Sequence, residues 1–184
     1  MSVIARSDRK RDISDHVGRP MGWREVSSLP RLHELRTMHG DVMGTLRWDE
    51  ELGSSAVAEC SRGTWIFRRR GLVKSRVIVR EQGSESDVAV LRTNWKGGGT
   101  LQGSGGQKYH WSNASLWASS WVFSTDAGEL LFEISTQQAR ERRDAEVRVE
   151  PCAASLQDLD LLVLLSGYLH ALVSDDFALA LAVS

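Results

Sequence analysis

The chain has 184 residues, of which 41% are hydrophobic, and its formal net charge is −1. This length suits a single domain, and the hydrophobic fraction excludes general disorder. A net charge so close to zero argues against a polyelectrolyte that binds nucleic acid, so no nucleic acid partner is expected. Any electrostatic partner would have to be attracted by a local patch.

The two cysteines, Cys60 and Cys152, lie far apart in the sequence and form neither a metal-ligand pair nor a disulfide framework. The first residues, Met1 to Arg6, lack the continuous apolar core of a secretory signal. A cytoplasmic location is therefore the simplest interpretation, although two cysteines could still pair in an oxidising compartment.

The first part of the chain divides into a polar segment and an ambiguous one. Residues 1–20 are charged and follow no structural period, which predicts a disordered arm, more often a solubilising tail than a binding arm. The remaining residues, 21–184, are predicted to form the single domain. Within 21–40, Trp23 and Val26 could belong to a first strand, and Leu29 to Met38 could form a short helix that begins near Pro30.

From Asp41 onward, apolar and polar residues alternate. Val77 and Val79, for example, oppose Arg76 and Arg80. This period of two predicts half-buried antiparallel strands, here over 41–48, 56–60, 64–68, 74–80, 87–93, 107–112, 120–124, 129–135 and 145–150. Glycine-rich segments between them, including 97–99 and 103–106, are interpreted as hairpin loops.

Large aromatic residues recur in pairs on single strand faces. The pairs are Trp65 with Phe67, Tyr109 with Trp111, and Trp121 with Phe123. Such stripes could stack nucleobases, but they more often fill a core. Trp95 and Trp117 lie near predicted loops and are the better candidates for exposed contacts.

After Pro151 the period changes to that of a helix, predicted at about 156–174 with Ser155 as its cap. Residues 161–165 are apolar on every helical face, so this helix must lie either in a membrane or inside protein. The apolar run is shorter than the roughly 20 residues that cross a bilayer. Asp175 and Asp176 then interrupt it, which favours a helix buried within the sheet.

Several stretches together resemble a known group of proteins. They are Gly44-Thr45-Leu46-Arg47-Trp48, Gly63-Thr64-Trp65-Ile66-Phe67-Arg68, Val77-Ile78-Val79-Arg80, Tyr109-His110-Trp111 and the apolar helix from Leu159 to Val173. Strands followed by such a helix resemble the tubby C-terminal-like superfamily, which includes LURP-one-related proteins and phospholipid scramblases. The resemblance implies a mainly β fold, an antiparallel closed β-barrel of hairpins wrapped around a buried hydrophobic C-terminal α-helix. It also implies recognition of anionic phospholipid headgroups, or a role as a peripheral membrane adaptor.

No set of side chains suggests catalysis. The five histidines are scattered without zinc-ligand spacing, and no serine has a nucleophile-elbow motif around it. The glycine clusters match neither the Walker A motif nor the dinucleotide fingerprint. We therefore expect no enzyme, no metal and no cofactor. No acidic loop has calcium-binding spacing, which is a departure from the scramblases.

The strongest positive feature is a run of basic residues on one predicted hairpin: Arg68, Arg69, Arg70, Lys74 and Arg76. Clustered cations of this kind could bind a phosphate headgroup. Strand alternation could turn Arg69 away from its neighbours, and the hairpin could equally be a solvated edge that discourages pairing. The sequence thus predicts a non-enzymatic binding module at a membrane surface, with a soluble protein-interaction domain as the alternative.

Overall fold

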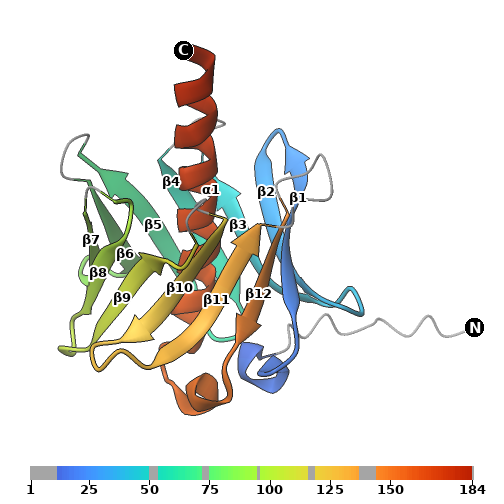
Figure 1. The fold of residues 1–184 in the computed structure, drawn as a ribbon, viewed down its shortest axis with the longest axis vertical. Helices are drawn as coiled ribbons and strands as arrows, with labels where there is room; N and C mark the ends of the chain where they lie inside the picture. The colour runs from blue at the N-terminus through green and yellow to red at the C-terminus, as the bar shows by residue number, and fades with distance from the viewer. Residues whose placement is uncertain are drawn as a thin grey trace, which may run out of the picture.

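The computed structural model describes residues 12–49, 54–71, 75–94, 96–115, 119–136 and 144–183, and for residue 177 and residues 179–183 the helical backbone alone. Over these residues, twelve antiparallel strands close into a barrel around the helix α1 (Leu159–Val183) (Figure 1). The strands are β1 (Met21–Ser28), β2 (Arg31–Thr37), β3 (Val42–Trp48), β4 (Ser55–Cys60), β5 (Thr64–Arg70), β6 (Arg76–Glu81), β7 (Asp87–Thr93), β8 (Gly99–Gly103), β9 (Lys108–Asn113), β10 (Ser120–Thr125), β11 (Leu130–Thr136) and β12 (Ala145–Val149).

Each strand pairs with its neighbours in the chain, and β1 pairs with β12 to close the ring, with Met21 opposite Val147. A closed ring leaves no strand edge exposed for pairing with another chain. The predicted mainly β fold, a barrel of hairpins around a buried helix, is therefore confirmed.

The first two strands resolve the ambiguity in residues 21–40. The predicted strand at Trp23 is β1, and the alternative of a helix from Leu29 to Met38 is wrong, because 31–37 form β2. The inward side chains of β2 are Arg31, His33, Leu35 and Thr37. Since three of these four are polar, the usual alternation of apolar and polar residues is absent from the strand.

The strand β8 was not predicted, because glycines bound it on both sides. A Cβ atom at Gly98 would lie 2.6 Å from the carbonyl oxygen of Trp111, and one at Gly99 would lie 2.5 Å from that of Arg92. The backbones of β7, β8 and β9 therefore approach too closely here for any side chain. Part of the glycine-rich sequence that was interpreted as loop is strand.

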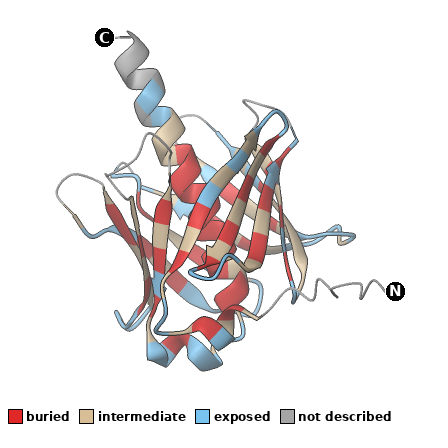
Figure 2. Ribbon diagram, turned by 90° about the vertical axis from the view of Figure 1, so that its right-hand side faces the viewer, coloured by how far each residue is buried: buried red, intermediate tan, exposed pale blue. Residues whose placement is uncertain are grey.

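The helix α1 fills the barrel as predicted, although its bounds differ from 156–174. It begins at Leu159, after the short 3-10 helix η2 (Pro151–Ser155), and it extends past the upper rim of the barrel to Val183 (Figure 1). Residues 162–170 are all buried, and they lie in the part of α1 that the strands surround (Figure 2). The helix packs mainly against β3, β4, β5 and β11.

Among the helices of the described chain, none has both the length and the apolar character that crossing a bilayer requires.

Residues 12–20 are more ordered than predicted. Residues 12–20 contain the 3-10 helix η1 (Ile13–His16), and the side chain of Ile13 is fully buried. The N–H of Gly18 donates a hydrogen bond to the carbonyl oxygen of Val149 (3.0 Å). The predicted disordered arm of residues 1–20 is therefore wrong for residues 12–20, while residues 1–11 lie outside the described chain.

The aromatic pairs fill the core, as the sequence predicts. Trp111 stacks on Trp121 with 5.2 Å between ring centroids, and Phe123 packs on Trp111 at 5.0 Å. Trp65 is the exception, since it is only half-buried. The two tryptophans predicted to be exposed, Trp95 and Trp117, lie outside the described residues.

Gly167 marks the closest approach between the helix and the wall. A Cβ atom there would lie 2.4 Å from Cε2 of Trp23, which is itself buried. We expect Gly167→Ala to lower the free energy of unfolding by about 1–3 kcal/mol, because this overpacking outweighs the better helix propensity of alanine, worth about 1 kcal/mol. Chemical denaturation checks this, and a variant more stable than the wild type would contradict the close packing.

Candidate anion-binding face

Three arginines stand side by side on the outer surface of the barrel. Arg70 of β5 lies directly opposite Arg76 of β6, and Arg76 lies directly opposite Arg92 of β7. Arg68 lies on the same face as Arg70, two residues earlier on β5, and all four side chains are exposed. We call these four residues the arginine ladder.

The ladder has no acidic counterpart in the part of the chain that the structure describes. Within the described residues, none of its four members forms an ion pair with a carboxylate. Like charges placed directly opposite each other on a sheet are destabilising, by an amount on the order of 0.2–1 kcal/mol per pair. An anion that bridges the guanidinium groups would therefore relieve this repulsion and stabilise the folded protein.

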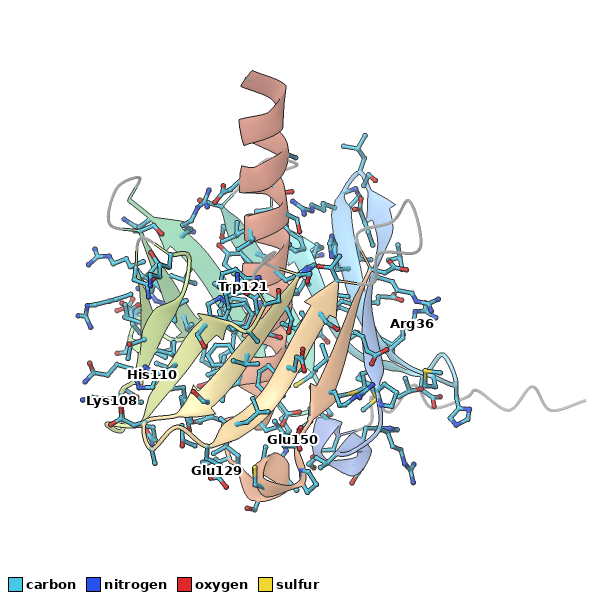
Figure 3. The ribbon with its side chains drawn as sticks, in the orientation of Figure 1. Arg36, Lys108, His110, Trp121, Glu129 and Glu150 are labelled. Carbon is cyan, nitrogen blue, oxygen red and sulfur yellow. The ribbon has the colours of Figure 1, made fainter. Side chains whose placement is uncertain are left out.

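Several other basic side chains on the outer surface have acidic partners. Arg80 pairs with Asp87 at 2.7 Å, and Arg148 pairs with Glu146 at 2.8 Å. On β9, Lys108 and His110 point outward near the lower rim (Figure 3), and His110 contacts Asp126 at 2.9 Å. In contrast to these three pairs, the ladder has no compensating carboxylate among the described residues.

Apolar side chains border the ladder on its lower side. Arg68 lies opposite Ile78, and Ile78 lies opposite Val90, with Ile78 and Val90 both half-buried on the outer face. The outer surface of β5, β6 and β7 thus carries a charged row next to an apolar row. A surface of this kind suits an interface where polar and apolar layers meet.

Arg69 differs from its neighbours Arg68 and Arg70 because its side chain contacts α1. Its guanidinium binds the carboxylate of Asp176 on α1 at 2.8 Å. Its backbone N–H lies 2.9 Å from the carbonyl oxygen of Ser54 and 3.1 Å from the hydroxyl of Tyr168, which itself donates to the Ser54 carbonyl. Arg69 therefore binds α1 to the barrel wall. Its side chain is turned away from those of Arg68 and Arg70, which was the possibility raised by strand alternation.

A second arginine, Arg31 of β2, also binds α1. Arg31 donates to both carboxylate oxygens of Asp175, at 2.6 and 3.3 Å, and its guanidinium lies 4.5 Å above the ring of Trp48. The two aspartates that interrupt the apolar run of α1 are thus both bound by arginines of the barrel rim. They mark the level at which the helix leaves the barrel.

Two buried histidines lie below this rim. His33 accepts a hydrogen bond from Nε of Arg31 (3.4 Å) and lies 3.9 Å from Glu25, while His170 contacts the hydroxyl of Thr136 at 2.9 Å. Burial lowers the pKa of each to about 4, with the Arg31 charge adding to the effect at His33. Both are therefore neutral packing residues at physiological pH.

The predicted basic cluster is thus divided by the structure. Arg68, Arg70 and Arg76 lie together on the outer face, Arg69 turns to the helix, and Lys74 lies outside the described residues. Sequence reasoning missed Arg92, which is distant along the chain. Pairing the two predicted strands 74–80 and 87–93 as a hairpin would have brought it near Arg76.

The described residues contain no group of three or more His, Cys, Asp or Glu side chains arranged to hold a metal ion. His33 and His170 are close enough to interact electrostatically.

Comparison with known proteins gives a likeness of fold. No family model matches this chain, and no curated protein matches it. The X-ray structure of a protein from Arabidopsis thaliana is similar over 90% of this chain and 96% of its own, with a TM-score of 0.56 and 10% sequence identity. This chain shares the fold of that plant protein. At such an identity the likeness concerns the fold alone and carries no ligand or activity with it.

Proposed function

We propose that this protein is a non-enzymatic binding module that recognises anionic phospholipid headgroups at a cytoplasmic membrane surface. The arginine ladder is the contact. The observation that carries this proposal is the row Arg70, Arg76 and Arg92, which lies on one exposed face without a carboxylate partner among the described residues.

The chemistry of the row fits phosphate. Arginine presents a planar fork of donors that matches phosphate oxygens, and adjacent guanidinium groups can share one doubly charged headgroup. Each basic residue near an anionic membrane contributes about 1 kcal/mol. Binding would also relieve the repulsion between the arginines, which water and salt only screen.

The position of the ladder supports a membrane as the source of that phosphate. Arg70 follows Arg69, which binds Asp176 where α1 leaves the barrel, so the ladder and the emerging helix share one end of the molecule. The residues of α1 after Asp176 are all apolar in sequence, and the helix extends beyond the rim (Figure 1). A surface with cations beside an apolar element is suited to the boundary between headgroups and acyl chains. The resemblance to the tubby C-terminal-like superfamily supports the same assignment.

A charge-matched pair of variants tests the proposal. The triple variant Arg70→Gln, Arg76→Gln, Arg92→Gln should bind anionic vesicles roughly 100-fold more weakly than the wild type, since three contacts of about 1 kcal/mol are removed. Sedimentation with vesicles containing phosphatidylserine measures this. The control is Arg24→Gln, Arg47→Gln, Arg148→Gln, which removes the same charge from exposed positions on β1, β3 and β12.

The control should retain affinity within a few-fold of the wild type. The ladder variant should be at least as heat-stable as the wild type, because it removes like charges that face each other. Equal loss of binding in both triple variants would show that net charge alone attracts the protein. Unchanged binding in the ladder variant would favour the alternative, a soluble protein-interaction domain.

A further inference from the structure

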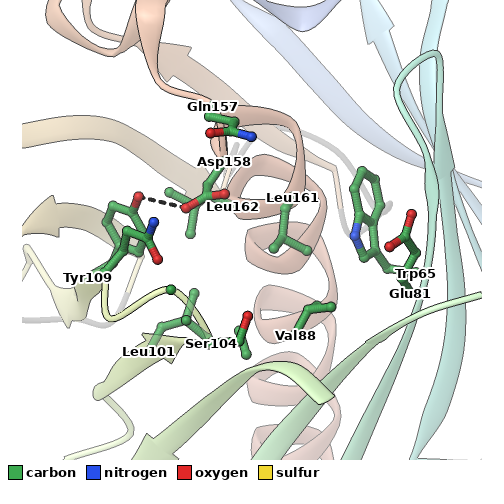
Figure 4. Close-up of a pocket in the computed structure, with 14 residues that line it drawn as sticks. Trp65, Glu81, Val88, Leu101, Ser104, Tyr109, Gln157, Asp158, Leu161 and Leu162 are labelled. Atoms are coloured by element: carbon green, nitrogen blue, oxygen red, sulfur yellow. Dashed lines mark hydrogen bonds between the residues drawn. The ribbon is translucent and has the colours of Figure 1, made fainter. Parts of the chain in front are cut away.

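A pocket of about 410 Å³ opens at the end of the barrel where α1 begins. It lies between the first turns of the helix and the strands β5 to β9 (Figure 4). Because α1 packs mainly against β3, β4, β5 and β11, space remains between the helix and the opposite wall. The arginine ladder lies at the other end of the helix, so this pocket is a separate feature.

The charged groups of the pocket are all acidic. Its lining includes the carboxylates of Glu81 and Asp158, and no Lys, Arg or His is among the described residues that line it. Neither carboxylate forms an ion pair with a basic residue in the described part of the chain. A pocket with this lining favours a positively charged group and repels an anion.

The hydrogen bond between Tyr109 and Asp158 fixes one side of the pocket. The Tyr109 hydroxyl donates to the Asp158 carboxylate at 2.8 Å (Figure 4). Burial, together with this hydrogen bond, raises the pKa of Tyr109 far above its usual range. The phenol therefore keeps its proton and stays a hydrogen-bond donor to Asp158.

Trp65 and Glu81 form the other side. They are directly opposite each other on β5 and β6, and Figure 4 shows the Trp65 ring standing beside the Glu81 carboxylate. Trp65 is half-buried and its ring packs over Gly63, where a Cβ atom would lie 3.0 Å from it. An indole face next to a carboxylate is a site where ammonium groups gain cation–π and ionic stabilisation together.

Apolar side chains form the floor between these two sides. Leu161 and Leu162 come from α1, and Val88, Ala89 and Leu101 come from the strands. Pockets that bind small organic molecules are typically apolar with a few polar groups that fix the orientation of the ligand. The floor would accept a hydrocarbon or aromatic body attached to the cationic group.

We propose that this pocket binds a small organic cation, an amine or quaternary ammonium group that carries an apolar body. The cationic group lies beside Glu81, against the Trp65 ring, and Asp158 on the other side of the pocket adds to the negative potential. The apolar body lies on Leu101 and Leu161.

Three probes of similar shape and different charge test this inference on the full chain: phenethylamine, 2-phenylethanol and 3-phenylpropionate. Binding is followed by NMR, from the shift of the Trp65 indole N–H signal, which Trp65→Phe identifies. Phenethylamine should bind at least about tenfold more tightly than 2-phenylethanol, and 3-phenylpropionate should bind more weakly still. Equal affinity for the cation and the alcohol would overturn the proposal, as would the absence of any shift with phenethylamine.

Variants of the two carboxylates then show which of them attracts the cation. Glu81→Gln should weaken phenethylamine binding by roughly three- to tenfold, and Asp158→Asn, which is farther from the Trp65 ring, should weaken it less. Glu129→Gln should leave it unchanged, because Glu129 is exposed near the same end of the barrel (Figure 3) and does not line the pocket. If Asp158→Asn disturbs folding, Glu81→Gln decides alone, since Glu81 is exposed at the mouth. Unchanged affinity in Glu81→Gln would overturn the proposal.

Discussion

Replacing Leu162 by aspartate is expected to leave the chain unfolded. Leu162 has no exposed surface, and the barrel surrounds this part of α1 on all sides. A buried carboxylate without a partner costs several kcal/mol, and the lost leucine adds about 2–5 kcal/mol. Together these costs match the whole stability of an ordinary domain, about 5–15 kcal/mol. Circular dichroism and the dispersion of NMR signals measure the outcome.

Ala178→Asp is the matched control for this variant. It adds the same charge to the same helix at an exposed position beyond the barrel, so the domain should keep its melting temperature within a few degrees. Truncation after Ala154 removes α1 altogether and should also prevent folding. A stable, cooperatively melting domain from either Leu162→Asp or the truncated chain would mean that the helix is not the core.

The stability of the domain is expected to fall steeply between pH 6.5 and pH 4. His33 and His170 are buried, and the folded state lowers the pKa of each from 6.5 to about 4. In this window the unfolded chain binds more protons than the folded one, so acidification favours unfolding. The effect is small at pH 6.5, disappears at higher pH, and reaches about 3 kcal/mol per histidine near pH 4. Urea denaturation at a series of pH values measures it.

Substitution of the two histidines separates their contribution from that of other groups. The double variant His33→Gln, His170→Gln should show a much flatter dependence between pH 6.5 and pH 4, whereas His39→Gln, at an exposed position, should follow the wild type. Burial raises the pKa of Asp160, so protonation of this carboxyl stabilises the folded state as the pH falls, opposite to the effect of the histidines. Asp160 is present in all the variants, so its contribution is the same in each. Identical slopes in the double variant and the wild type would contradict the assignment.

Much of the fold could be predicted because most strands bury apolar side chains at every second residue. In β6, Val77 and Val79 face inward between exposed or half-buried positions, and the apolar α1 then needed a closed surface around it. The prediction failed where the interior is polar or where side chains are absent. Arg31 and His33 occupy inward positions of β2 because they bind Asp175 and Trp48 at the rim, and β8 carries glycines because its backbone neighbours lie too close.

The candidate site was predictable only as far as it is local in sequence. Arg68 and Arg70 share a face because they are two residues apart on a strand, and Arg76 faces Arg70 across one turn. Arg92 joins them through the register of the next hairpin, which a bulge between Val79 and Arg80 shifts by one residue. No pattern in the sequence reveals that shift. The ion pair between Arg69 and Asp176 joins residues 107 positions apart, and it depends on where the helix leaves the barrel.

The pocket beside the start of α1 was not predicted at all. Its members come from β5 to β9, from the residues just before α1 and from the helix itself. Each fits an ordinary role within its own segment: Trp65 fits a core stripe, and Asp158 fits the beginning of a helix. Their arrangement results from the off-centre position of α1 in the barrel, which depends on the packing of the whole interior.

Sedimentation of the wild-type protein with neutral and anionic vesicles, at low and at physiological salt, tests the proposed function most directly. We predict that the protein sediments with vesicles containing phosphatidylserine, that raising the salt weakens this binding, and that the protein stays in solution with purely phosphatidylcholine vesicles. Failure to bind the anionic vesicles even at low salt would contradict the assignment of the arginine ladder to phospholipid headgroups.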